Sequence, residues 1–142
     1  MFRKILVAYD GSSYSQVALD QAVEIARLCQ AELHVIGIVQ TTGAAALAEG
    51  VGAVDVWGLE RKQIEAALES VSRDLGGQAL NVVTSVREGD PAEEIVFSAI
   101  GLGADLVVLG HTNKGIFARW FEGSVGAKIL KELPCSLLIA SR

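Results

Sequence analysis

Short apolar runs recur along this chain, separated by segments whose apolar residues lie three and four positions apart. The runs predict five strands, at residues 5–9, 33–39, 80–86, 105–109 and 135–140. A run without alternation, as at 5–9, is typical of a parallel strand buried on both faces. We therefore expect a parallel sheet that is covered by other elements on both sides.

The segments between the runs predict helices. The first has an apolar face from Val17 to Cys29 behind a cap at Ser12 or Ser13, and the second covers 57–75. The third covers 91–100, with Asp90 as its cap and Pro91 as its first residue, and the fourth covers about 123–132. Residues 40–56 have no sustained period and are interpreted as a surface excursion.

Strands and helices alternate through the whole chain, which predicts an open, doubly wound α/β fold in one domain, residues 1–142. In such sheets a ligand lies beyond the carboxyl ends of the strands, where the strand order reverses. The first strand ends at Tyr9-Asp10 and the fourth ends at Leu109-Gly110. If these two strands are neighbours, the loops that follow them face one crevice.

Composition narrows the classes of partner. The chain has 142 residues, of which 51% are hydrophobic and 20% charged, and a net charge of −5. This charge argues against nonspecific binding to nucleic acid or to an anionic membrane. We expect no signal peptide before the first strand, and no apolar run reaches the roughly 18 residues of a membrane span. Cys29 and Cys135 lack metal-type spacing and are interpreted as buried, inert thiols, so we expect a cytoplasmic protein.

The segment after the fourth predicted strand has features of a phosphate-binding loop. Gly110 would let a ligand approach the backbone closely, and His111 would donate a hydrogen bond to a phosphate. Gly123-Ser124 opens a predicted helix and offers free N–H groups and a hydroxyl to an anion, with the N–H of Val125 beside them. The alternative is that the glycines only end a strand and begin a helix, and that His111 is an exposed loop residue.

Two familiar catalytic patterns are missing from the sequence. Gly110 and Gly115 have the interval of a P-loop, but Ile116-Phe117 stands where Lys-(Ser/Thr) is required. No Ser-His-Asp arrangement is recognisable, and no general base is evident beside a γ-phosphate. We therefore expect no enzymatic activity, or at most slow hydrolysis of ATP.

Three stretches together resemble the universal stress protein family. They are the opening KILVAYDGS at residues 4–12, the turn VREGDP at 86–91 and the closing PCSLLI at 134–139. The resemblance covers essentially the whole chain. It implies a Rossmann-like fold of the adenine nucleotide alpha hydrolase-like type, with five parallel strands in the order 3-2-1-4-5.

The chain resembles the nucleotide-binding branch of that family, with one departure. That branch carries Gly-x2-Gly-x9-Gly-(Ser/Thr), and here Gly110 and Gly123-Ser124 match its first and last positions, while Asn113 occupies the place of the second glycine. Asparagine is the least unfavourable non-glycine residue in the left-handed region, so a purely conformational requirement is met there. A steric requirement would not be met, although Gly115 offers another way for the loop to form.

The resemblance implies a small protein that binds ATP or AMP, either alone or together with a Mg or Mn ion. Such a protein acts as a nucleotide-responsive regulator in the stress response. Asp10 would hold the adenine or ribose side, or else serve as a turn or capping residue, and Ala8 and Ile38 would line the adenine slot. Antiparallel pairing of the last strand would form a homodimer. The alternative is a dimeric interaction module without nucleotide; an enzyme on the electron-transfer-flavoprotein or PP-loop architecture is a weaker third.

Overall fold

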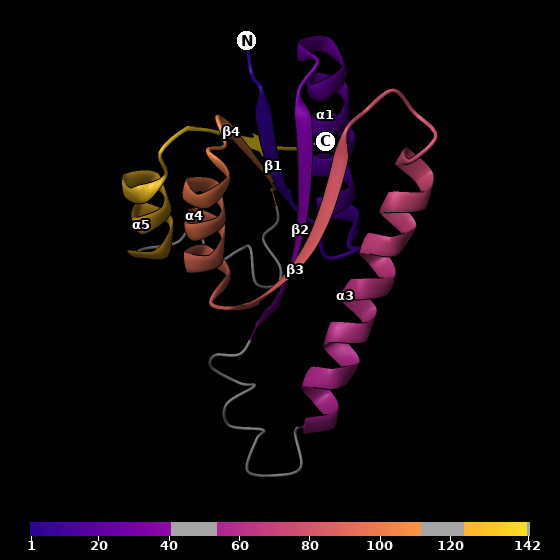
Figure 1. Ribbon diagram of the computed structural model, residues 1–142. Coiled ribbons are helices and arrows are strands. Elements are labelled where there is room, and N and C mark those ends of the chain that lie inside the picture. The colour runs from indigo at the N-terminus through magenta and orange to yellow at the C-terminus, as the bar shows by residue number, and fades with distance from the viewer. Residues whose placement is uncertain (41–53, 112–123, 142) are drawn as a thin grey trace.

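The computed structural model describes residues 1–40, 54–111 and 124–141. Five strands form a single sheet in the order β3-β2-β1-β4-β5, and every neighbouring pair is parallel. The strands are β1 (Lys4–Ala8), β2 (Glu32–Gln40), β3 (Val82–Gly89), β4 (Leu106–Gly110) and β5 (Ser136–Ala140). The predicted fold class and strand order are thus confirmed (Figure 1).

The helices cover both faces of this sheet. They are α1 (Ser13–Cys29), α3 (Val54–Leu75), α4 (Pro91–Leu102) and α5 (Ser124–Glu132). One core cluster joins α1 and α3 to the sheet, and a second joins α4 and α5 to its opposite face. Figure 1 shows α4 and α5 on the side of the sheet away from α3. Among the described residues there is no candidate for a membrane-spanning helix.

The amino-terminal caps of α1 and α4 are residues that the sequence analysis predicted. The Ser12 side chain accepts a hydrogen bond from the Ser15 N–H at 3.2 Å and so begins α1. Asp90 accepts from the Glu93 N–H at 3.0 Å, and Pro91 is the first helical residue of α4, as predicted. These caps satisfy backbone donors that a helix otherwise leaves free at its first turn.

The boundaries of four strands lie within one residue of the prediction. The third strand, predicted at 80–86 with Glu88 and Gly89 in a turn, spans Val82–Gly89. Both belong to β3, because they pair in register with Val39 and Gln40 of β2. Along this edge strand exposure alternates at first and does not form one apolar run, so the apolar pattern underestimates its length. In α4 the last helical residue is Leu102, and the left-handed Gly103 follows it.

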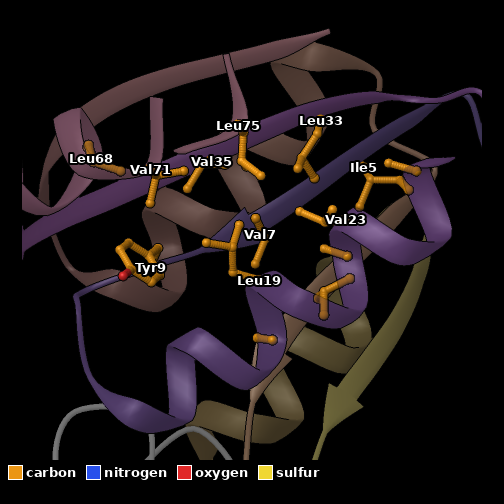
Figure 2. Close-up of a cluster of buried hydrophobic side chains, with 14 of the residues drawn as sticks. Ile5, Val7, Tyr9, Leu19, Val23, Leu33, Val35, Leu68, Val71 and Leu75 are labelled. Carbon is orange, nitrogen blue, oxygen red and sulfur yellow. The ribbon is translucent and has the colours of Figure 1, made fainter. Parts of the chain in front are cut away.

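The buried strands are apolar on both faces because each face meets helices. On β1, Ile5 and Val7 point toward α1 and α3, whereas Leu6 and Ala8 point toward α4 and α5. Figure 2 shows the α1–α3 side of this core, with Tyr9 among the side chains of both helices. Cys29 and Cys135 are only partly buried, and both are free thiols.

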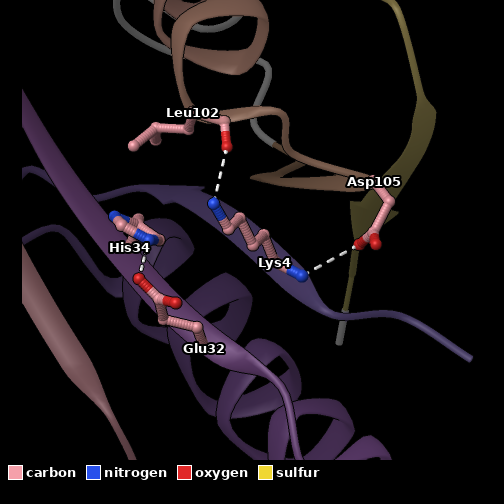
Figure 3. A network of polar contacts seen from close by, with 5 residues as sticks. All are labelled: Lys4, Glu32, His34, Leu102 and Asp105. Carbon is pink, nitrogen blue, oxygen red and sulfur yellow. Dashed lines mark hydrogen bonds and ion pairs between the residues drawn. The ribbon is translucent and has the colours of Figure 1, made fainter.

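A group of polar contacts lies near the amino ends of the strands, away from their carboxyl ends (Figure 3). The backbone N–H of Lys4 donates to Asp105 at 3.1 Å, and the Lys4 ammonium donates to the Leu102 carbonyl at 3.2 Å. His34 and Glu32 of β2 form a contact of 2.7 Å. The two Lys4 contacts therefore join β1 to the end of α4 and to the residue before β4, whereas the His34–Glu32 contact lies within β2.

Candidate functional site

The strand order reverses at the position that the sequence predicted. β1 and β4 are neighbours, paired from Ile5 with Leu106 to Val7 with Val108. The chain leaves β1 toward β2 on one side, whereas β4 leads to β5 on the other, so the order reverses between β1 and β4. The segments that follow these two strands therefore emerge at one edge of the sheet.

A pocket of about 200 Å³ opens beside this edge, at the carboxyl ends of β1 and β2. It brings together four residues that were predicted as site residues, which are Ala8, Tyr9, Asp10 and Ile38. Five further residues complete it: Ile36, Glu60, Gln63, Ile64 and Pro91. Its walls are buried aliphatic side chains, and carboxylate and amide groups supply its polar atoms. This combination is typical of sites for small, partly apolar ligands.

The residues of α3 in this pocket were missed by the sequence analysis. Periodicity placed Ile64 on the apolar face of a helix, which is correct, since it is 5% exposed. Nothing in the periodicity, however, indicates that this helix reaches the end of β1. Glu60 and Gln63 therefore had no signal that would identify them as lining residues.

Asp10 is held in a turn by one of its two carboxylate oxygens. Oδ1 accepts from the Ser12 N–H at 2.9 Å and from the Ser15 hydroxyl at 2.8 Å. Gly11 allows this turn, because its φ of +85° lies in the region that favours glycine. In the described part of the chain, Oδ2 has no hydrogen-bond partner. Asp10 is thus a turn residue, with Ser12 as the helix cap, and it keeps one oxygen free for a ligand.

Tyr9 is both a pocket residue and a core residue. It is 9% exposed, and its hydroxyl donates to Oε1 of Gln16 at 3.0 Å. Burial first, and then the nearby carboxylates of Asp10, Asp20 and Asp74, raise the pKa of the phenol above its ordinary value. Tyr9 therefore stays protonated at neutral pH and serves as a fixed, neutral wall.

The predicted residues at the end of β4 lie apart from this lining. Leu109 is fully buried in the core on the α4–α5 side, and the exposed His111 donates its backbone N–H to the Ala140 carbonyl at 2.8 Å. A Cβ added at Gly110 would lie 2.4 Å from the carbonyl oxygen of Tyr14. The first turn of α1 therefore approaches β4 at Gly110, which gives this glycine a packing role that the motif spacing did not reveal.

The remaining predicted residues follow residues 109–111 in the chain, and two of them begin α5. Ser124 and Val125 are the first two residues of α5. Asn113, Gly115 and Gly123 lie outside the described residues. Within the described ranges, no group of three or more His, Cys, Asp or Glu side chains could hold a metal ion.

Comparison with known proteins shows that both the sequence and the fold are similar to those of universal stress proteins. A family model for the universal stress protein family matches residues 1–141. A universal stress protein of Methanocaldococcus jannaschii is 32% identical, with 100% of this chain and 84% of the relative covered. Universal stress protein YxiE of Bacillus subtilis is 31% identical, with 98% and 99% covered. The solved universal stress protein UspA from Lactobacillus plantarum is 24% identical with a TM-score of 0.82, covering 98% of this chain and 97% of that one, and shows the same fold.

Proposed function

This chain belongs to the universal stress protein family, and we propose that it binds an adenine nucleotide at the crevice between β1 and β4. In this proposal the base and ribose occupy the pocket at the carboxyl ends of β1 and β2. The phosphates lie toward the end of β4 and the start of α5. The nucleotide acts as a regulatory ligand in the stress response, in the cytoplasm, and is not a substrate for rapid turnover.

The observation that carries the proposal is the pocket beside Asp10. Ala8, Ile36 and Ile38 present buried aliphatic surface to a planar base, and the free Oδ2 of Asp10 is an acceptor for a ribose hydroxyl. Asp10 and Glu60 are acidic, so their charges favour a pose with the phosphates directed away from this pocket. This division between an apolar slot and a separate anion site suits a nucleotide.

The start of α5 supports the phosphate side of the proposal. Ser124 is the first residue of a nine-residue helix, whose amino end has free N–H groups and a partial positive charge. Gly123 precedes it in the sequence, in the pattern of the nucleotide-binding branch. Because the described residues contain no ready set of protein ligands for a metal, any Mg or Mn would arrive with the phosphates of ATP.

Two solved relatives of the same fold contain adenine nucleotides. A universal stress protein was solved in complex with cAMP; it is 23% identical with a TM-score of 0.62, covering 99% of this chain and 97% of that one. A universal stress protein family protein from Arabidopsis thaliana was solved with AMP bound; it is 16% identical with a TM-score of 0.70, covering 99% and 92%. These complexes belong to those proteins, and they support adenine as the base in our proposal.

Calorimetric titration of ATP and of AMP into the wild-type protein tests the proposal. Asp10→Asn keeps an acceptor for the turn but replaces one carboxylate oxygen by a donor, so we expect roughly tenfold weaker binding. Gly123→Val tests the phosphate side. Glu69→Gln is the matched control, because it removes the same charge from an exposed residue outside the pocket.

The possible results distinguish whether the protein binds a nucleotide at all from whether it binds at the proposed site. No heat from the wild type with either nucleotide at millimolar concentration would refute nucleotide binding. Binding by the wild type that neither Asp10→Asn nor Gly123→Val weakens would refute the site while leaving the ligand. Release of phosphate at the rate of an ordinary ATPase would contradict the regulatory assignment.

β5 favours a second candidate function, that of a dimeric interaction module. It lies at one edge of the sheet, and its residues Leu137, Leu138 and Ile139 are only partly buried. An apolar edge strand offers unpaired backbone groups to another chain. Antiparallel pairing of two β5 strands would form a homodimer with or without nucleotide. Sedimentation as a monomer at about tens of micromolar would rule out this dimer.

A further inference from the structure

α1 and α3 lie on the same face of the sheet with a groove of about 620 Å³ between them. Each helix packs mainly on the strands and makes few contacts with the other helix. The walls are the stretch of α1 from Gln16 to Arg27 and the end of α3 from Ser70 onward, with Gln78 beyond it. This groove is separate from the pocket at the carboxyl ends of β1 and β2, although Tyr9 borders both.

The floor of the groove is apolar and firmly packed. It consists of Tyr9, Leu19, Val23, Val71 and Leu75, each at most 9% exposed. Figure 2 shows these side chains converging from α1, from α3 and from Tyr9, which directly follows β1. A floor already filled to this extent cannot admit a large apolar side chain, and it presents only a small apolar surface to the groove.

The rim of the groove is acidic. Asp20 and Glu24 stand one helical turn apart on α1, and Asp74 faces the groove from α3. Asp20 accepts a hydrogen bond from Gln16 Nε2 at 2.8 Å, whereas the carboxylates of Glu24 and Asp74 have no partner among the described residues. Arg27 is the one cationic side chain among the described lining residues. Three carboxylates against one guanidinium leave an excess of negative charge on an accessible rim.

We propose that this groove is a docking site for a basic segment of a partner protein. Lysine and arginine side chains lay their methylene stems on apolar surface and keep their charged ends in water, which matches an apolar floor below an acidic rim. The two unpartnered carboxylates lie on opposite walls, so a segment that runs along the groove meets both. A single metal ion does not fit the arrangement, because the described residues contain no group of acidic side chains close enough to hold one.

The test uses two synthetic peptides, one of alternating lysine and leucine and one of alternating glutamate and leucine. Each is titrated into isotopically labelled full-length protein, and the backbone amide resonances are followed by NMR. We expect the lysine peptide to shift resonances of α1 from Gln16 to Arg27 and of α3 from Ser70, and the binding to weaken with added salt. The glutamate peptide should produce no such shifts.

Two triple variants with the same change in net charge locate the site. Asp20→Asn/Glu24→Gln/Asp74→Asn removes the rim, and we expect about tenfold weaker binding of the lysine peptide. Glu65→Gln/Glu69→Gln/Glu132→Gln neutralises three carboxylates outside the groove and should bind as the wild type does. Circular dichroism confirms that both variants are folded.

A charge-reversal variant tests the same site when neutralising the carboxylates changes the affinity for the lysine peptide only slightly. Asp20→Lys/Glu24→Lys should lose the lysine peptide and gain the glutamate peptide. Equal weakening by both triple variants would refute the groove as the site. Equally tight binding of spermine, with shifts of the same resonances, would refute a protein segment as the occupant and assign a small polyamine. Unchanged nucleotide binding in all these variants is expected and keeps this proposal independent of the proposed function.

Discussion

Replacing Gly110 by alanine would place a methyl group 2.4 Å from the carbonyl oxygen of Tyr14 and 2.7 Å from its carbonyl carbon. Non-bonded heavy atoms pack best at about 3.5–4.0 Å, so β4 and the first turn of α1 must separate. The opposing atoms belong to the backbone and cannot be relieved by a change of rotamer. The Ser12 cap and the Asp10 turn hold that part of α1 in place, which raises the cost of moving it.

Overpacking of this kind typically costs about 1–3 kcal/mol. For a chain of this length, that corresponds to a fall in the midpoint of thermal unfolding of roughly 3–9 °C. Urea and thermal unfolding followed by circular dichroism measure both quantities. Gly101→Ala is the matched control, because nothing lies within 4 Å of the added methyl group and the residue is inside α4. It should stabilise the protein by about 0.5–1 kcal/mol through helix propensity.

The comparison between these two glycines isolates packing, because both substitutions reduce the entropy of the unfolded chain in the same way. If Gly110→Ala unfolds at the same temperature as the wild type or higher, the close approach of α1 to β4 does not constrain this position. A destabilised Gly110→Ala protein also has a consequence for the nucleotide experiments. Its loss of binding would not by itself indicate contact with a phosphate, so Asp10→Asn and Gly123→Val are the better probes.

Three further outcomes follow from single side chains. Ser98 Oγ is the one buried side-chain polar atom without a hydrogen-bond partner in the described ranges, so Ser98→Ala should stabilise the protein by about 1 kcal/mol in urea unfolding. Asp90→Ala removes the cap of α4 and should cost about 1 kcal/mol in the same assay, whereas Asp90→Asn should cost much less. The pKa values of Tyr9 and Cys135 are raised above their ordinary 10.0 and 9.0, mainly by burial, so the unfolded chain releases these protons first. Stability should therefore be fully retained below about pH 9 and fall as the pH rises further; Tyr9→Phe/Cys135→Ser should show a flatter alkaline limb, and an unchanged limb would contradict this assignment.

Much of the fold was predictable from local pattern. The apolar runs identified the five strands, and the signal is clearest for the central strands β1, β2 and β4, because strands buried on both faces have no polar side. The helix caps at Ser12 and Asp90 were predictable because a cap depends on residues only a few positions apart. β3 was the exception, since an edge strand is partly solvated and its last residues, Glu88 and Gly89, are recognised only by their pairing with β2.

The residues of the candidate site likewise fall into two groups, those that local sequence pattern identifies and those that only the tertiary structure brings together. The sequence singled out Asp10 and Gly110 as candidates because they follow apolar runs directly, and the resemblance added Ala8 and Ile38; of these, Gly110 lies outside the pocket lining. What the sequence determined by itself is the set of elements and, to within one residue, the chain positions at which β1, β2, β4 and β5 end. Only the tertiary structure decided that α3 brings Glu60 to the pocket, that Tyr14 packs on Gly110, and that α1 and α3 face each other across an acidic groove. These contacts join residues far apart in the chain, and periodicity shows which face of a helix is buried but not which strand end or helix it meets.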